Sequence, residues 1–563
     1  MKKKLSLLLL LFVILFSCKK EKMNVERDNR TEVNNRTLSN LRIVNLGGYN
    51  QVIANGNKLT NFIEREANDP DAGKYPGTDY FPKDGRMGAT WQVPQDLFGA
   101  DGSLQLKFTV PGEGIHNPEL NLKGDRVQPL DYYLLTNMDI SGQPEYVTVE
   151  RGIAQPSKPD HFKIRIINLC AKYKYGVISP RGQMEDLIGP LSLAYADGTL
   201  VAPETSNVTL EKRVSGYVEL PYGTYQFRVL TPDGRQVPGT TEITIDPPTS
   251  TITAIRNNEI ASTNLTYAPV TTFQPGGVYT IVVAPYDFNF DASPWEVQSG
   301  AVQNAFRVIT DVSPGGNITY SRLQGVNAFT GRQTIGFRID GIDLAKALSF
   351  GQTSAYGNYV QGQHVIEATD ASGKVIAKTE QVLRPAQNYT AWLYPTTTGT
   401  ASLVLVANDL SGTQYTGNGN VDDPSGNILQ SGFFFSRRFL NLSPDNPYTT
   451  FTQDNGKLIT EGINLQPGLP LLQQPYSIGI YWQTAFEMMA YRSAPGIVPG
   501  IWASDIPVLK SQDFIMRKAL YENAGRDLPD QEPGVYTIAL IGRSGTNVEL
   551  SDKARMIIVK HTR

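Results

Sequence analysis

Three loop-like stretches carry aromatic side chains of the kind that stack on the apolar faces of sugars. Proline or glycine lies close to Trp91, Trp295 and Trp502, which disfavours regular structure around them. An exposed indole or phenol ring offers a flat surface that loses little conformational entropy on binding. The sequence therefore gives five candidate ligand-binding residues: Trp91, Tyr80, Trp295, Tyr286 and Trp502. The alternative is that these rings form small cores beneath long loops.

Motifs that would carry catalysis or hold a metal are missing. The histidines stand far apart, and the sequence contains no HExxH motif, cysteine pair or GxSxG elbow. Asn418, Asn420 and Asp422 alternate as at the start of a calcium loop, but the glycine and the terminal glutamate of that loop are absent. A solvated linker explains them better. We predict a protein that is not an enzyme and needs no metal or cofactor.

Composition limits the partners and the number of domains. The chain has 563 residues, which is too long for one hydrophobic core and predicts several domains. Its 51 basic and 54 acidic residues give a formal charge of −3, so no electrostatic footprint for nucleic acid is expected. Cys18 and Cys170 are the only cysteines, and Cys170 is expected to be a small, half-buried residue at the end of a strand.

The first residues have the three parts of a secretory signal. Lysines at positions 2 to 4 precede an apolar run from Leu7 to Phe16, followed by Ser17 and Cys18. The run is too short for a membrane span of about 20 residues. Residues 15 to 18 resemble the lipobox of bacterial lipoproteins, which implies cleavage before Cys18, acylation of its thiol and a membrane-lipid anchor. Lys19 after the cysteine resembles the sorting signal for the outer membrane. Residues 18–40 are expected to form a disordered tether.

Two landmarks recur along the rest of the chain. An arginine followed by apolar residues opens four segments, at Arg42, Arg165, Arg307 and Arg438. A tyrosine-bearing, β-rich run follows each of them, at Tyr133, Tyr279, Tyr389 and Tyr536. Short alternating runs and many Gly and Pro residues lie between the landmarks, as in chains of short strands joined by turns. Only 341–350 and 511–525 look helical.

We therefore predict an all-β fold of four tandem, antiparallel, immunoglobulin-like β-sandwiches. The expected division is a signal peptide at 1–17, the lipidated tether at 18–40, sandwiches at 41–158, 159–302 and 303–413, a linker at 414–432 and a sandwich at 433–563. The middle of each repeat varies in length more than its ends, which places the variation in loops.

The third repeat resembles an uncharacterised family of domains of unknown function in bacterial cell-surface proteins. The resemblance covers residues 306–412 and rests on "FRVITDVSPGG", "IGFRIDGIDLAKALSFGQTSAY" and "NYTAWLYP". It implies tandem β-sandwich modules, often on lipoproteins, with no catalytic residues. The whole chain also resembles accessory outer-membrane lipoproteins of Bacteroidota, which hold glycans near a TonB-dependent transporter.

These features predict a non-catalytic, lipid-anchored protein of the outer membrane and cell surface. Its expected task is to bind an extracellular ligand such as a polysaccharide. The alternative is a structural, adhesion or scaffold module of a protein assembly at the cell surface. An exposed platform of aromatic rings would favour the first, and buried rings would favour the second.

Overall fold

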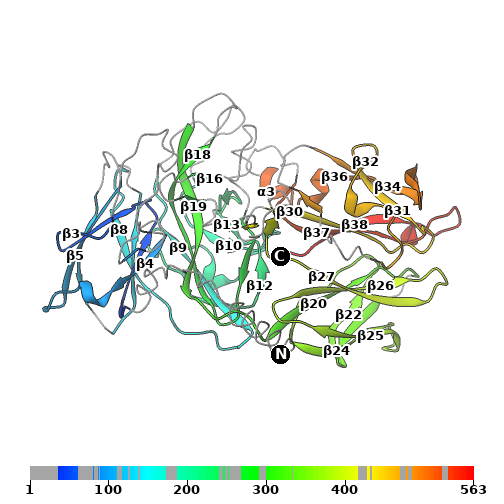
Figure 1. Cartoon of the computed structure of the whole chain (residues 1–563), viewed down its shortest axis with the longest axis horizontal. Coiled ribbons are helices and arrows are strands. Elements are labelled where there is room, and N and C mark those ends of the chain that lie inside the picture. The colour runs from blue at the N-terminus through cyan, green and yellow to red at the C-terminus, as the bar shows by residue number, and fades with distance from the viewer. Residues whose placement is uncertain are drawn as a thin grey trace, which may run out of the picture.

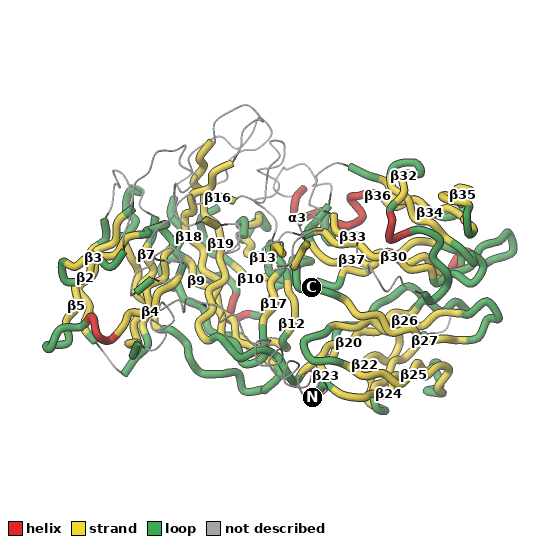
Figure 2. Tube along the Cα trace, viewed as in Figure 1, coloured by secondary structure: helices red, strands yellow, loops and turns green. Residues whose placement is uncertain are grey.

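The fold is built almost entirely from β-strands, as the sequence predicts (Figures 1 and 2). A computed structural model describes residues 36–60, 80–81, 87, 89–110, 117–124, 127–136, 140–172, 187–239, 245–246, 251–252, 268–290, 299–331, 334–415, 428–430, 434–469, 477–479, 485–522 and 531–562. The strands group into four consecutive pairs or sets of sheets, which we call units 1 to 4. The all-β fold class is confirmed.

Unit 1 shows the arrangement most simply. Two four-stranded sheets enclose one apolar core. The first has the order β4-β1-β7-β8, with strands Thr90–Pro94, Leu38–Asn45, Leu130–Leu134 and Tyr146–Glu150. The second has the order β3-β2-β5-β6, with strands Asn57–Lys58, Gln51–Ala54, Ser103–Thr109 and Glu119–Lys123. In β5 and β6 every second residue is buried, because alternate side chains point to opposite faces of a sheet.

Unit 3 repeats this topology strand for strand. Its first sheet is β23-β20-β26-β27, with strands Gly357–Val360, Tyr320–Asn327, Asn388–Pro395 and Ala401–Asn408. Its second sheet is β22-β21-β24-β25, with strands Ile342–Leu348, Ile335–Ile339, Gly362–Thr369 and Val375–Leu383.

Unit 4 has the same order with one extra strand. Its first sheet is β33-β30-β37-β38, with strands Ser477–Gly479, Phe435–Asn441, Gly534–Ile541 and Arg555–Lys560. Its second sheet is β32-β31-β34-β35, with strands Lys457–Leu458, Thr449–Gln453, Glu487–Ala494 and Ile497–Trp502. The short β36, Leu509–Lys510, also pairs with β34. Between units 3 and 4, β28 (Thr413–Tyr415) and β29 (Ile428–Gln430) form a two-stranded sheet.

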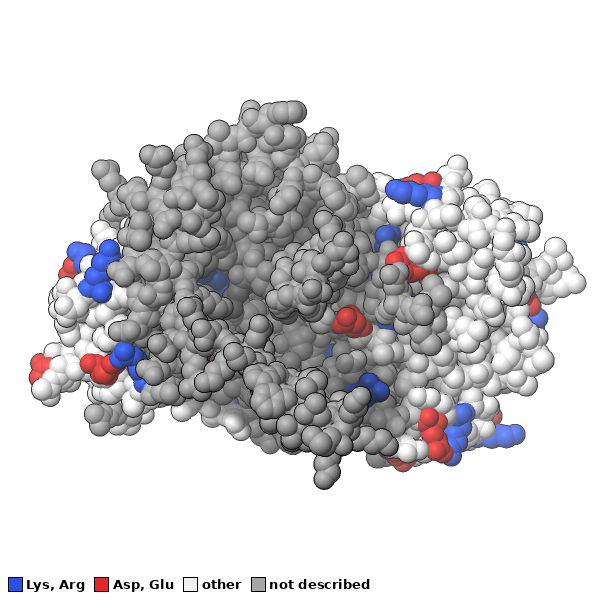
Figure 3. Space-filling model, in the orientation of Figure 1, with Lys and Arg blue, Asp and Glu red and all other residues white. Residues whose placement is uncertain are grey.

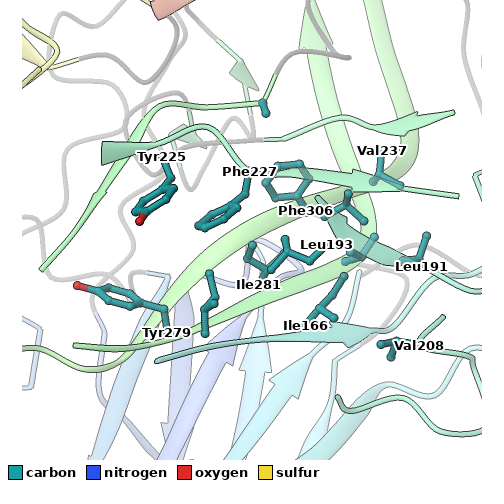
Figure 4. Packing of buried hydrophobic residues seen from close by; sticks show 14 of the residues in the cluster. Ile166, Leu191, Leu193, Val208, Tyr225, Phe227, Val237, Tyr279, Ile281 and Phe306 are labelled. Carbon is teal, nitrogen blue, oxygen red and sulfur yellow. The ribbon is translucent and has the colours of Figure 1, made fainter. Parts of the chain in front are cut away.

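Unit 2 keeps the first sheet and departs in the second. Strands β11 (Val218–Pro221), β9 (His161–Asn168), β18 (Val278–Phe290) and β19 (Ser299–Val312) pair in that order, and β15 (Ile245–Asp246) and β16 (Thr251–Ile252) extend the sheet beyond β18. The remaining strands form two small sheets, β10-β13-β14 (Ser192–Ala194, Arg228–Leu230, Gln236–Val237) and β12-β17 (Gly223–Tyr225, Thr271–Phe273). Figure 4 shows the core that they enclose.

In every unit the first strand pairs with the strand that carries the tyrosine landmark. β1 pairs with β7, β9 with β18, β20 with β26 and β30 with β37, each time in parallel. The sandwiches are therefore not purely antiparallel as expected, because each contains this central parallel pair. The tyrosine hydroxyls explain the second landmark: Tyr279 and Tyr389 accept a bond from the backbone N–H five residues earlier, and Tyr536 donates to the carbonyl of Glu532. These bonds fix the turn that feeds the tyrosine strand in units 2, 3 and 4.

The assignment of Arg307 to the first strand of the third repeat is wrong. Arg307 lies on β19, which pairs along its length with β18 of unit 2, and Phe306 beside it belongs to the core of that unit (Figure 4). Unit 3 begins instead with β20. There Gln324 takes the arginine position, since it pairs with Thr390 as Arg165 pairs with Thr280 and Arg438 with Thr537. The predicted domain limits themselves stay predictions.

A buried asparagine three residues after this position occurs in all four units. The residues are Asn45, Asn168, Asn327 and Asn441, each at most 3% exposed. Each side-chain amide donates to backbone carbonyls and accepts a backbone N–H in the chain just after the strand. Because buried backbone groups must be paired, this residue holds the connection that leaves the first strand.

The expectation of helices is half right. Residues 341–350, expected to be helical, form strand β22 instead, which pairs with β21. Within 511–525, a 3₁₀ turn at Ser511–Phe514 precedes the single-turn α3, Ala519–Glu522. Other 3₁₀ turns lie at Gln95–Leu97, Pro203–Thr205, Thr460–Gly462 and Leu550–Asp552.

The units pack against one another through the outer faces of their first sheets. One apolar cluster joins Val44 and Leu46 of unit 1 to Ile167 and Val282 of unit 2. Another joins unit 3 to unit 4 around the fully buried Trp392. Two smaller clusters join units 2, 3 and 4. Figure 1 accordingly shows units 3 and 4 side by side, with unit 2 between them and unit 1.

Candidate functional site

The edge of unit 4 exposes an apolar strand. β35 is the last strand of its sheet and pairs only with β34 in the described chain. Four of its residues, which we call the β35 surface, are strongly exposed: Ile497 (62%), Val498 (36%), Ile501 (78%) and Trp502 (46%). Neighbouring residues on an ordinary half-buried strand alternate between core and solvent. Here both faces of the strand carry apolar side chains into solvent.

A glycine makes this geometry possible. The β34–β35 register shifts between Arg492 and Ala494, which marks a bulge. Gly500 lies in this bulge with φ +92°, and a Cβ there would sit 2.1 Å from the carbonyl oxygen of Arg492. Only glycine tolerates both conditions. The bulge therefore turns β35 away from the regular face of the sheet.

Ion pairs border the β35 surface, both in the sheet and in the adjoining loops. Arg492 pairs with Asp505 at 2.7 Å, and its Nε donates to Asn446. The hydrogen bond from Arg492 holds the pKa of Asp505 below its ordinary value. Arg543 pairs with Asp445 at 3.0 Å. An apolar centre with a polar rim is the usual composition of a protein–protein contact.

Trp502 is the only exposed ring among the predicted ligand-binding residues whose side chains the structure describes. Trp91 is 8% exposed and packs 5.1 Å from Phe81 in the core of unit 1. Tyr80 is half-buried, with the guanidinium of Arg36 4.3 Å from its ring centre. The fold does not bring the rings of Trp91, Tyr80 and Trp502 together into one platform.

Tyr286 connects two units rather than facing solvent. It is 4% exposed, and the guanidinium of Arg307 lies 3.8 Å from its ring centre. Arg307 also donates to the carbonyls of Asn45 and Leu46 in unit 1. Trp295 and Cys18 lie outside the described residues, so their predicted roles stay predictions.

Buried polar groups link unit 1 to unit 2. Arg42 contacts Asp131 of its own unit at 2.5 Å and Asp311 of unit 2 at 2.6 Å. Tyr217 donates to the same Asp311 carboxylate at 3.0 Å, and Arg151 approaches Asp131. Burial alone would lower the pKa of Arg42, but the two carboxylates raise it above its ordinary value. This network of buried charges therefore spans the contact between units 1 and 2.

A second buried cluster links unit 2 to unit 4. Glu532 accepts from Arg228 of unit 2 at 2.7 Å, from Tyr521 at 2.8 Å and from Lys560 at 3.2 Å. Burial alone would raise the pKa of Glu532, but Arg228 and Lys560 hold it below the ordinary value. Burial lowers the pKa of Lys560 to about 8.

A buried histidine links unit 3 to unit 4. His561 Nδ1 lies 3.0 Å from the amide nitrogen of Gln324 and 3.1 Å from the hydroxyl of Tyr356, and its Nε2 lies 2.7 Å from Thr537. An amide nitrogen only donates, so Nδ1 accepts and Nε2 carries the proton. Burial, together with the charge of Arg438, lowers the pKa of His561 well below its ordinary value.

Sequence reasoning missed both the inter-unit clusters and the aliphatic part of the β35 surface. The one local signal was "GIVPGIW", an apolar strand without the polar alternation of a half-buried one. Among the described residues, no group of three or more His, Cys, Asp or Glu could hold a metal ion. No helix in that part of the chain is both long and apolar enough to cross a membrane. Figure 3 shows Lys and Arg interspersed with Asp and Glu on the described part of one face.

Comparisons with known proteins show neither a family nor a function for this chain. No family model and no curated protein matches the chain. Among solved structures, the Bacillus anthracis TIE protein matches with 12% identity and a TM-score of 0.11 over 63% of this chain and 50% of its own. The chain thus spans about half of that protein. A "putative cell adhesion protein" from Bacteroides fragilis matches with 14% identity and a TM-score of 0.12 over 46% of this chain and 99% of its own. At such TM-scores neither likeness bears on function.

Proposed function

We propose that this chain is a non-catalytic structural or adhesion module, anchored by lipid at Cys18 in the outer membrane and displayed on the cell surface. Its four sandwiches act as a scaffold that presents the β35 surface to an apolar segment of another cell-surface protein. The observation that carries this proposal is the exposure of four neighbouring apolar residues on one edge strand. Single exposed apolar side chains are ordinary, but a contiguous group with a polar rim is typical of contact surfaces.

The buried contacts between units support the scaffold role. Ion pairs inside a protein are strongly directional, and losing one partner leaves an uncompensated charge. Arg42 with Asp311 and Arg228 with Glu532 therefore favour one arrangement of the units. A fixed arrangement lowers the entropy cost of presenting a surface to a partner.

The test is cross-linking on intact cells followed by purification of the full-length protein. Ile501→Asp should abolish the cross-linked partner, because a carboxylate in the apolar centre would have to be desolvated. Ile342→Asp is the matched control, since Ile342 is 73% exposed on β22 of unit 3. An unchanged partner pattern with Ile501→Asp would refute the β35 surface as the contact.

Glycan binding is the second candidate, and only the exposed ring of Trp502 favours it. A sugar site needs hydrogen-bonding groups beside a ring, whereas the other three members of the β35 surface are aliphatic. Retardation of the protein in polysaccharide affinity gels, lost in Trp502→Ala and kept in Ile501→Ala, would support the glycan role over the protein contact.

A further inference from the structure

A buried arginine in the core of unit 4 has no anionic partner in the part of the chain that the structure describes. Arg437 lies on β30 between Phe435 and Phe439, both core residues, and is 8% exposed. Among the described residues, its guanidinium donates only to the sulfur of Met488 at 3.7 Å, and its Nε has no acceptor there. No carboxylate or carbonyl among the described residues accepts from it.

The same position holds an aliphatic residue in the other units. Arg437 pairs across the central parallel ladder with Tyr536, as Ile164 pairs with Tyr279 and Leu323 with Tyr389. Ile164 and Leu323 are fully buried in the cores of units 2 and 3, and Leu41 holds the matching place in unit 1. The fold therefore does not need a charge at this place.

The surroundings of the guanidinium are aromatic. Its carbon lies 5.4 Å from the ring centre of Phe435 and 5.3 Å from that of Phe486. Cation–π contacts of this kind hold the guanidinium plane but do not neutralise its charge. Burial lowers the pKa of Arg437 to about 10, so the group is still charged at neutral pH, and Glu461 and Asp454 oppose the shift without forming an ion pair with it.

We propose that unit 4 binds a small carboxylate with an apolar body, whose carboxylate pairs with Arg437 and whose body packs against Phe435, Phe486 and Met488. A guanidinium fork matches a carboxylate with two parallel hydrogen bonds. The aromatic and thioether walls suit the apolar part of the ligand. This site is separate from the β35 surface and does not depend on its role.

Benzoate is the probe, and benzamide, acetate and inorganic phosphate are the comparisons, all added to the full-length protein during thermal unfolding. Benzoate should raise the Tm in a concentration-dependent way, because a ligand that binds only the folded state stabilises it. Benzamide lacks the charge, and acetate and phosphate lack the apolar body, so each should raise the Tm less. An equal effect of benzoate and any comparison compound would overturn the proposal.

Arg437→Leu tests the residue itself. It should remove the effect of benzoate and leave the ligand-free Tm equal or higher, because leucine fills this position in units 1 and 3. Arg437→Lys should weaken benzoate binding by roughly tenfold, since one bidentate contact is lost, and serves if the leucine variant does not fold. Arg555→Leu is the control, because Arg555 also lies over a ring, Phe350, but outside this core.

Two outcomes of these variants contradict the site. A benzoate effect that persists in Arg437→Leu places the binding elsewhere. A ligand-free Tm that falls in Glu461→Gln shows that this carboxylate of the chain, and not a ligand, balances Arg437.

Discussion

The guanidinium of Arg228 and the carboxylate of Glu532 meet at 2.7 Å although 304 residues separate them in the sequence. Both side chains are almost completely buried between units 2 and 4. Lys560 shares the same carboxylate. One acidic side chain thus compensates two buried cations and joins distant parts of the chain.

Replacing Glu532 by alanine should destabilise the protein strongly. Arg228 and Lys560 would be left buried without a counter-charge, which costs about 3–5 kcal/mol. Urea denaturation would measure the loss in the free energy of unfolding. Asp233→Ala is the control, because it breaks an exposed pair with Arg235 and a local hydrogen bond from Thr231, and it should cost at most about 1 kcal/mol. Equal losses in both variants would contradict the role of Glu532.

His561 should make the protein sensitive to acid. Its folded pKa lies well below the ordinary value of 6.5, so below pH 6.5 the unfolded chain binds a proton that the folded chain does not. The free energy of unfolding should then fall with decreasing pH by up to about 1.4 kcal/mol per unit from this residue. In His561→Gln that part of the slope should vanish, whereas His364→Gln should keep it. The free energy of unfolding would be measured against pH from roughly 7.5 to 5 for wild type and His561→Gln. Parallel curves would refute the role of His561 in acid sensitivity.

Truncation of the two tryptophans should cost very different amounts of stability. Trp392 is fully buried between units 3 and 4, so Trp392→Ala should lower the free energy of unfolding by about 3–5 kcal/mol. Trp502 is exposed, and Trp502→Ala should change it by less than about 0.5 kcal/mol. Chemical denaturation followed by circular dichroism measures both. A large loss for Trp502→Ala would mean that its ring is needed for folding, not for contact.

Cys18 should carry the membrane anchor. Cys18→Ser should remove the acyl mass from the mature chain and shift the protein from the membrane to the soluble fraction, because no other lipid attachment is expected. Cys170→Ser is the control, since Cys170 lies in the core of unit 2. Mass spectrometry and cell fractionation give the readouts. A Cys18→Ser protein that stays in the membrane fraction would exclude this anchor.

The features that could be predicted from sequence are those set by nearby residues. Short strands joined by turns were predicted, and residues 370–374 form such a turn between β24 and β25, because the carboxylate of Asp370 accepts backbone N–H groups from Ser372 and Lys374. The tyrosine strands were found because proline and glycine mark the turns before them. Local chemistry was sufficient in both cases.

Features that depend on the pairing of one strand with another were predicted less well. Residues Ile342–Leu348 have the composition of a helix but form a strand, because pairing with β21 outweighs local propensity. Arg307 was taken for a first strand, although its strand completes the sheet of unit 2. The sequence pattern of one strand does not show which neighbouring strand it pairs with.

The sequence by itself determined the β-rich composition, the recurring strand ends and the signal-like N-terminus, since each follows from residues a few positions apart. The tertiary structure decided which rings are exposed and which charges are compensated. Trp91 and Trp502 lie in similar loop-like sequences, yet one is buried and the other exposed. Burial and ion pairing are set by side chains that reach a residue from distant parts of the chain, as Glu532 reaches Arg228, and no local pattern encodes them.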